Sequence, residues 1–403
     1  MHESNLFATL FLMGFIKNYD QLAKTPQRKI VLDLIETAIS SIQPENVMGS
    51  LFNLQNNELV IKDQKFDLKN FENVYLIGFG KGSARISKII EEKLEQKLTE
   101  GYVIDVTSEQ FSKIELTIGT HPVVSQTNID FTKKVVDRFS NLSKKDLVLV
   151  VVAGGGSALF ELPKEISTGE LIKVYENLQQ SGKNIEEMNK ERTRLSKVKG
   201  GDLARILSPA KIVGLIFSDV PGNDLSTVAS GPTDDPRATN ILILSNKTAL
   251  DAMKKKTDEL NINAQIYFDE VQGEAKVVGA ELLKATKPNS ILLAAGETTV
   301  KVSNKNGKGG RNQELVLGAL LNIDKNTTIA SFDSDGWDNT EFAGAIGDSQ
   351  TLRKAKELNL DIQKFLDESN SFEFFTKVGD GIQTSRLPSN VSDIMIVLKK
   401  PQK

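Results

Sequence analysis

The chain has 403 residues, a formal net charge of −3, and 39% hydrophobic and 26% charged residues. This composition is typical of a soluble globular protein, the length favours two domains, and the small negative charge argues against nucleic-acid binding. The absence of cysteine excludes disulfides, a thiol nucleophile and cysteine-ligated metals, and the two histidines, His2 and His121, exclude most histidine-based metal sites.

The N-terminal segment from Leu6 to Ile16 is apolar but too short to span a bilayer, and no Lys or Arg precedes it. We therefore expect an amphipathic segment that packs on a domain, no membrane contact, and a cytoplasmic location. The apolar spacing that follows predicts one or two helices between Lys29 and Leu54, broken at Pro44. Residues 59–66 predict a small hairpin.

The stretch from Val74 to Ser83 predicts a buried strand, a turn with alternating glycines, and the start of a helix. Such a turn presents backbone N–H groups to an anion, and Lys81 adds a positive charge there. Three interpretations stay open: a purely structural turn, a dinucleotide site with Gly78, Gly80 and Asp105, or another phosphate site. The lysine in the turn and the displaced third glycine weaken the dinucleotide interpretation.

Residues 146–153 form the most strand-like run, apolar throughout and so expected to be buried on both faces. It ends on Gly154, Gly155, Gly156 and Ser157, where consecutive glycines allow N–H groups to converge on an anion. The alternatives are a tight turn without a ligand, and a nucleophilic Ser157 that would need His121 as its base.

Two basic regions follow. Residues 189–201 predict a basic helix that runs into a glycine turn, where Arg192, Lys199 and, as a third candidate, Arg194 are natural partners for a carboxylate or phosphate, although most charged helices are simply solvated. Arg311 lies in the first turn of a predicted helix, where the helix dipole disfavours a cation, which indicates a ligand.

Acidic turns follow two further predicted strands and carry Asp219, Asp335 and Asp338. Oxygen-rich turns at strand ends suit Mg²⁺, and Asx-turn chemistry is the alternative for each. Phosphate turns, basic residues and such carboxylates together suggest phosphoryl transfer.

Strands and helices alternate through the whole chain, which predicts an α/β protein with mostly parallel sheets. The loop at residues 231–236 is the best candidate boundary. We therefore predict an N-terminal Rossmann-like domain at 1–236 and a second α/β domain at 237–403.

A set of longer motifs resembles the glycerate kinases of the MOFRL type. They are GFGKGS at residues 78–83, HPV at 121–123, GGGSALFELP at 154–163, LSKVKGGDLA at 195–204, SDVPGND at 218–224, ASGPT at 229–233, GETTV at 296–300, GGRNQEL at 309–315 and SDGWDN at 334–339.

The resemblance implies ATP-dependent phosphorylation of D-glycerate, to 2-phosphoglycerate, in sugar-acid catabolism of the non-phosphorylative Entner–Doudoroff type. It implies Mg²⁺ or another divalent cation, a cleft between two α/β domains, and a monomer or homodimer.

The catalytic residues expected are Lys81, Arg311 and Asp219. The substrate-binding residues expected are Lys81, Arg192, Arg311 and Ser157, and the Mg²⁺ ligands are Asp219, Asp335 or Asp338. The residues expected at nucleotide and phosphate are Gly154, Gly155, Gly156, Ser157, Lys199, Gly200, Glu297, Thr298, Gly310 and Asn312.

Two alternatives belong to other classes. One is an NAD-dependent hydroxy-acid dehydrogenase that uses Gly78, Gly80 and Asp105, and the other is a non-enzymatic sugar-acid sensor. The first predicts activity with NAD and none with ATP, and the second predicts glycerate binding without ATP consumption.

Overall fold

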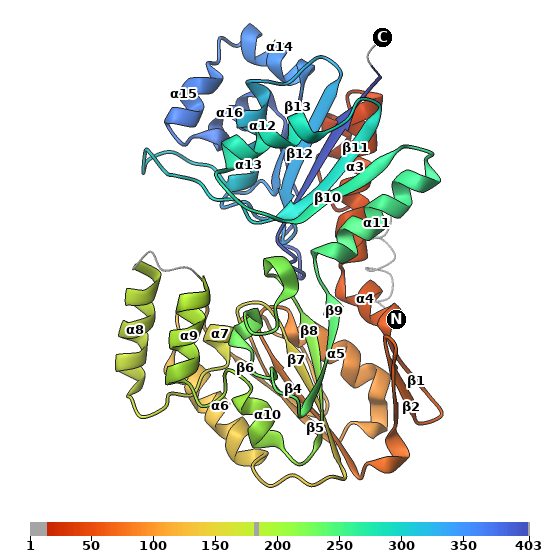
Figure 1. Ribbon diagram of the computed structural model, residues 1–403, viewed down its shortest axis with the longest axis vertical. Coiled ribbons are helices and arrows are strands. Elements are labelled where there is room, and N and C mark those ends of the chain that lie inside the picture. Colours follow the sequence, from red (N-terminus) through yellow and green to blue (C-terminus); the bar gives the residue numbers. More distant parts are fainter. Residues whose placement is uncertain (1–13, 181–184, 402–403) are drawn as a thin grey trace. The chain divides into compact units, whose positions relative to one another are not determined.

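The computed structural model describes residues 14–180 and 185–401, so most of the apolar N-terminal segment lies outside the described residues. The chain divides into two compact units. We call Pro44–Ser245 the central unit, and the residues up to Gln43 together with those from Asn246 onward the terminal unit. Figure 1 shows the elements of each unit.

The central unit is built on a six-stranded sheet. Its strands are β4 (Asn73–Phe79), β5 (Glu100–Asp105), β6 (Ile114–Ile118), β7 (Asp146–Val152), β8 (Lys211–Phe217) and β9 (Ala238–Leu244). They lie in the order β6-β5-β4-β7-β8-β9, and every pairing in it is parallel. This is the strand order of a doubly wound Rossmann sheet, so the predicted Rossmann-like fold is confirmed.

Helices and a small second sheet complete the central unit. The helices are α4 (Pro44–Leu51), α5 (Ser83–Leu94), α6 (Gln126–Arg138), α7 (Gly156–Leu159), α8 (Thr168–Gln180), α9 (Ile185–Leu195) and α10 (Asp202–Leu207). The small sheet is antiparallel and has strands β1 (Phe52–Gln55), β2 (Glu58–Ile61) and β3 (Gln64–Asp67). In Figure 1, α8 and α9 lie side by side at one edge of this unit.

The core of the central unit follows from its strand sequences. Every residue of β7 is buried, as its continuous apolar run predicted. Alternate residues of β4, Tyr75, Ile77 and Phe79, pack with Val148 and Val150 in one cluster. Burial of such side chains contributes about 1.5–3 kcal/mol each. This rigid sheet fixes the strand ends from which the loops emerge.

The terminal unit has a mixed sheet in the order β10-β11-β15-β12-β13-β14. Its strands are β10 (Ala264–Val271), β11 (Ser290–Gly296), β12 (Thr327–Asp333), β13 (Gly344–Asp348), β14 (Gly381–Ile382) and β15 (Asp393–Lys399). Its helices are α2 (Tyr19–Leu22), α3 (Pro26–Ser41), α11 (Asn246–Glu259), α12 (Ala275–Ala285), α13 (Arg311–Leu320), α14 (Ser349–Glu357), α15 (Ile362–Asp367) and α16 (Ser371–Val378).

The expectation of mostly parallel sheets is wrong for this unit. Only β10 and β11 pair in parallel, whereas the other pairings of the sheet are antiparallel. The reason is that β15 inserts between β11 and β12 against their direction, and no helix separates β12 from β13. Sequence alternation cannot reveal such an insertion.

The predicted division at residue 236 differs from the observed units at both ends. Strand β9 lies beyond residue 236, yet it pairs with β8 and belongs to the central unit. Helix α3 lies at the other end of the chain and packs on α11, β12 and β15. Its fully buried Arg28 donates to Asp348 and Asp380 at 2.8 Å each, which fixes α3 to the terminal unit.

Within the described ranges, none of the helices combines the length and the apolar character that crossing a bilayer requires.

Candidate active site

The strand order of the central sheet reverses between β4 and β7, and ligands of such folds bind beyond this point. Two glycine turns meet there. Gly80 has φ +108°, and a Cβ on it would lie 2.4 Å from the carbonyl oxygen of Ala153. The amide of Lys81 donates to the carbonyl of Gly154 at 2.8 Å. The glycines of the first turn therefore serve its close packing against the second.

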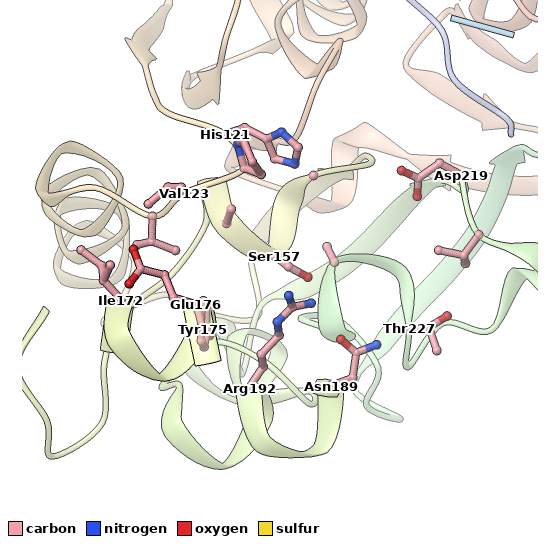
Figure 2. Close-up of a pocket in the computed structure, with 16 residues that line it drawn as sticks. His121, Val123, Ser157, Ile172, Tyr175, Glu176, Asn189, Arg192, Asp219 and Thr227 are labelled. Atoms are coloured by element: carbon pink, nitrogen blue, oxygen red, sulfur yellow. The ribbon is translucent and has the colours of Figure 1, made fainter. Parts of the chain in front are cut away.

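A cavity of about 210 Å³ opens beside these turns, and Figure 2 shows its lining. It is lined by residues from the β7–α7 turn, α8, α9 and the loops after β6 and β8: His121, Pro122, Val123, Val124, Gly155, Ser157, Ala158, Ile172, Tyr175, Glu176, Asn189, Arg192, Asp219, Val220, Thr227 and Ala229. The sequence predicted Gly155, Ser157, Arg192 and Asp219 as site residues, and the fold brings these four together.

Three ionisable side chains gather around the second glycine turn. The Asp219 carboxylate packs so closely on Gly154 that a Cβ there would lie 2.0 Å from Oδ2. A Cβ on Gly155 would lie 2.8 Å from the His121 ring and 3.5 Å from Cγ of Lys81. Because Gly154 and Gly155 have no side chains, there is room beside them for Lys81, His121 and Asp219.

His121 carries no charge at neutral pH in this setting. Desolvation of its ring by the neighbouring loops and, second, the charge of Lys81 lower the pKa of His121 to about 4. A neutral imidazole can donate and accept hydrogen bonds at the mouth of the cavity.

Two buried donors of helix α9 have no hydrogen-bond partner among the described residues: Nε of Arg192 and Nδ2 of Asn189. Figure 2 shows both side chains extending toward Ser157. The oxygen atoms nearby are already engaged, because Ser157 Oγ lies 2.8 Å from Ser230 Oγ and Ser230 donates to Asn189 Oδ1 at 3.1 Å. An unpaired buried donor is costly, so these atoms indicate a ligand with acceptor oxygens.

Lys199 does not serve the predicted role in nucleotide binding. Its side chain is fully buried, and its ammonium donates to Glu161 at 2.5 Å and to the carbonyls of Ser157 and Phe160 at 2.9 and 3.3 Å. An ammonium has three N–H groups, so none is left for a phosphate. Gly200 is also engaged, since its amide donates to the carbonyl of Ser230 at 3.0 Å.

The dehydrogenase alternative assigned Asp105 to a ribose, and the structure contradicts this assignment. The Asp105 side chain is fully buried and accepts hydrogen bonds from the amides of Ala84, Val106 and Thr107. It ties the end of β5 to the start of α5, so it cannot grip a ligand.

The terminal unit holds the second group of predicted residues. Gly296, Asp393 and Asp333 are paired in register across β11, β15 and β12, so they lie at the same edge of the sheet. Arg311 at the start of α13 reaches this edge. Its guanidinium contacts Asp393 at 2.6 Å, Glu297 at 2.8 Å and Asp333 at 3.2 Å.

The charges of this cluster depend on one another. Burial lowers the pKa of Arg311, but the charges of Asp393, Glu297 and Asp333 outweigh burial and raise it. Burial raises the pKa of Asp393 to about 7, against the opposing effect of Arg311, and burial together with Asp393 and Asp335 raises that of Asp333. One cation therefore holds several carboxylates, and a phosphate bound by Arg311 has to share the guanidinium with them.

Asp338 and Asn312 have structural roles that contradict their predicted ones. The buried Asp338 carboxylate accepts from the backbone amides and side-chain amides of Asn312 and Gln313, at 2.9–3.2 Å. It thereby satisfies N–H groups at the start of α13 and has no oxygen left for Mg²⁺. The Asn312 side-chain amide also donates to Asp393 at 2.8 Å, so it helps to hold the carboxylate that Arg311 contacts.

The remaining predicted residues keep their assignment as predictions. Thr298 is buried and its Oγ1 has no partner, and Asp335 donates its amide to Asp333 Oδ1 at 3.1 Å while its carboxylate accepts from Trp337. In the part of the chain that the structure describes, no group of three or more His, Cys, Asp or Glu could hold a metal ion. Mg²⁺ usually takes one or two carboxylates and completes its shell with phosphates, so Asp219 or Asp335 still fits such an ion.

Sequence reasoning assigned no role to three residues that lie in these two places. They are Asn189, Tyr175 and Asp393, and their proximity to Arg192 or Arg311 depends on tertiary packing. The one usable signal was a polar residue that opens an apolar strand, as Asp393 opens β15.

A doubly wound sheet with a cavity near its reversal point, lined by both apolar and polar side chains, defines a small-molecule enzyme of the α/β class. Comparison with known proteins makes this specific. The family model DUF4147, a domain of unknown function, matches residues 30–260, and the MOFRL family matches residues 290–393.

Known relatives span nearly the whole chain. A glycerate 2-kinase from Pyrococcus horikoshii is 31% identical over 92% of this chain and 97% of its own length. A crystal structure of a glycerate kinase from Thermotoga maritima aligns with a TM-score of 0.82 at 29% identity, covering 92% of this chain and 99% of that one. A protein from Agrobacterium vitis named putative hydroxypyruvate reductase is 29% identical over 80% of this chain and 98% of its own length.

The chain therefore belongs to the MOFRL-type glycerate kinase family, and it is a kinase.

Proposed function

We propose that this protein transfers the terminal phosphoryl group of ATP to the 2-hydroxyl of D-glycerate, giving 2-phosphoglycerate in glycerate catabolism. One observation carries the proposal: Arg192 Nε and Asn189 Nδ2 are buried donors without partners in a cavity at the reversal point of the sheet. A small hydroxy-acid brings the oxygen atoms that these donors lack. Relatives named glycerate 2-kinase support the choice of acid and hydroxyl.

The roles proposed follow from the chemistry around the cavity. The planar guanidinium of Arg192 suits a carboxylate, and Asn189 donates a further hydrogen bond to it. Asp219, beside Gly154, accepts the proton of the reacting hydroxyl or orients that hydroxyl. Lys81 neutralises charge on the phosphoryl group in transfer, because phosphoryl transfer depends mainly on positioning and charge neutralisation.

Mg²⁺ supplies further neutralisation of the phosphate oxygens when it is bound with ATP. We propose Asp219 or Asp335 as the carboxylate that meets it. The glycine turn Gly154 to Ser157 is proposed to cradle an anion, and Arg311, Glu297, Thr298 and Gly310 are proposed for the nucleotide. That Lys81 and Arg311 contact the same substrate remains a prediction.

The product decides the proposal. D-glycerate and Mg·ATP are incubated with the enzyme, ADP release is followed with a coupled assay, and the product is identified by ³¹P and ¹³C NMR. We expect 2-phosphoglycerate. Formation of 3-phosphoglycerate would overturn the choice of hydroxyl, and no ADP release with glycerate would overturn the substrate. NAD reduction by glycerate without ATP turnover would instead favour the dehydrogenase.

A variant of the cavity tests the carboxylate site. Arg192→Met should raise KM for D-glycerate about a hundredfold, because it removes a charged hydrogen bond to the carboxylate. KM for ATP should stay within about twofold. Arg194→Met is the matched control, since Arg194 lies on the same helix but is exposed and paired with Glu191. Equal KM values for both variants would contradict the proposed carboxylate site.

A further inference from the structure

A buried ion pair lies directly behind the cavity and contacts two of its walls. Glu161 and Lys199 are both fully buried, and their charged atoms are 2.5 Å apart. Neither lines the cavity. A buried ion pair contributes little net stability, because the cost of desolvation offsets the attraction between the charges. Its presence behind a ligand cavity therefore asks for another explanation.

Lys199 holds the side of the cavity that carries Ser157. Lys199 donates to the carbonyl of Ser157 at 2.9 Å and to that of Phe160 at 3.3 Å, so its ammonium holds the short helix α7 by its carbonyl groups. Ser157 presents its hydroxyl to the cavity and bonds Ser230. The position of this hydroxyl therefore depends on the buried ammonium.

Glu161 holds the side of the cavity that carries Arg192, through Tyr175. The Glu161 carboxylate accepts the hydroxyl of Tyr175 on helix α8 and the amide of Leu162 at 2.9 Å. The guanidinium carbon of Arg192, on helix α9, lies 5.4 Å from the centre of the Tyr175 ring. Such a cation–π contact fixes the plane of the guanidinium, while Nε of Arg192 has no other partner to orient it.

We propose that the Glu161–Lys199 pair and Tyr175 are positioning residues for substrate carboxylate binding: they set the geometry between the Arg192 guanidinium and the Ser157 hydroxyl. This proposal rests on the proposed function. The pair is linked to both sides of the cavity, through Lys199 to Ser157 and through Glu161 and Tyr175 to Arg192. The distance between Ser157 and Arg192 is therefore fixed, even though α8 and α9 lie at the edge of the unit.

The test uses the full-length enzyme and two variants. The double substitution Glu161→Leu with Lys199→Met removes both charges and keeps the volume, which buried pairs often tolerate. Tyr175→Phe removes one hydroxyl and keeps the ring under Arg192. We expect the double variant to raise KM for D-glycerate about tenfold, and Tyr175→Phe to raise it about threefold. KM for ATP and kcat should change by less than about twofold.

Asp146→Asn is the matched control. Asp146 is a buried carboxylate at the opposite end of β7, and it accepts from Asn73 at 2.8 Å and from Ser143. A lost polar contact there should lower thermal stability without moving KM for D-glycerate. A change in KM for both the control and the double variant would show that KM follows stability, and would overturn the proposal.

Two further outcomes decide the case. A folded double variant with unchanged KM for D-glycerate would overturn positioning by the pair. If the double variant does not fold, Tyr175→Phe decides, and unchanged KM in that variant overturns the proposal. Failure of the proposed function is recognised separately, because Arg192→Met would then also leave KM for D-glycerate unchanged.

Discussion

Two arginines on helices have opposite surroundings. Arg192 of helix α9, in the central unit, has no ion pair among the described residues, its buried Nε has no hydrogen-bond partner there, and its guanidinium lies over the Tyr175 ring. Arg311 in the terminal unit contacts three carboxylates, on Glu297, Asp333 and Asp393. We propose an anionic ligand for the first arginine, whereas the second is paired with carboxylates of the protein. The same residue type thus belongs to a proposed ligand site in one unit and to a charge cluster in the other.

The difference teaches that a basic residue near a glycine turn is an ambiguous signal in the sequence. For Arg192, the informative observation is a buried donor with no carboxylate paired to it among the described residues, because buried donors are nearly always paired. For Arg311, an approaching phosphate has to share the guanidinium with three carboxylates, which repel it unless a cation accompanies it. Variants of the two units should therefore behave differently.

The largest effect is expected at Lys81, beside the central cavity. Lys81→Ala should lower kcat about a thousandfold, because it removes a charge that stabilises the transition state. Steady-state kinetics with D-glycerate and ATP measure it. Lys88→Ala is the control, since Lys88 lies on the helix that follows and pairs with Glu91. Near-normal turnover of Lys81→Ala would contradict a catalytic role for the central unit's lysine.

A smaller effect, and one on stability, is expected at Arg311. Arg311→Met leaves Glu297, Asp333 and Asp393 without their cation, so the free energy of unfolding should fall by about 3 kcal/mol. The loss should be larger at pH 8 than at pH 6, because the carboxylates are then ionised. Arg192→Met should change stability by less than about 0.5 kcal/mol.

Denaturant unfolding at both pH values measures this contrast. Lys276→Met serves as control, because Lys276 belongs to the same unit and pairs with Glu274 on the surface. Equal stability of the Arg311 and Arg192 variants would remove the distinction between the two arginines.

The smallest effect is a difference in pH dependence. Folded Asp393 keeps its proton up to a pKa of about 7, whereas an unfolded aspartate loses it near pH 4. Between these values the folded state binds more protons, so the stability of the terminal unit should fall as pH rises from 4 to 7. Burial also raises the pKa of Glu314 to about 7, which adds to the fall.

The central unit should show the opposite trend over part of this range. The pKa of His121 is lowered to about 4, so between pH 4 and about 6.5 the unfolded state binds more protons and stability rises with pH. Hydrogen exchange of β7 and β11 peptides at several pH values separates the two units. Glu314→Gln should flatten the slope of the terminal unit only. Parallel slopes in both units would contradict the assignment of these protonation states.

Much of the fold could be predicted from the sequence, because its signals are local. Continuous apolar runs fixed strands such as β7, and the glycine turns after β4 and β7 followed from the need for positive φ and close approach. The helix Pro26–Ser41 was expected, from Lys29 onward, because of its apolar spacing. These features depend on neighbours a few residues away.

The candidate site was predicted only in part. Arg192, Ser157 and Asp219 were expected and do meet at one cavity. Lys199 was assigned to a phosphate, because a buried lysine and an exposed one look alike in sequence, and its partner Glu161 lies 38 residues away. The same reasoning failed for Asp338, whose four hydrogen bonds come from the start of α13, 25 and 26 residues earlier.

The sequence by itself determined an α/β protein with glycine turns, basic residues and acidic strand ends, because periodicity and turn chemistry act over short distances; the expectation of a kinase came from the resemblance of its longer motifs to a known family. Only the tertiary structure decided that β15 inserts between β11 and β12, that α3 joins the terminal unit through Arg28, and which cations are paired with carboxylates of the protein. The physical reason is that burial and charge pairing join residues far apart in the chain, and the free energy of a charged group is set by what surrounds it after folding.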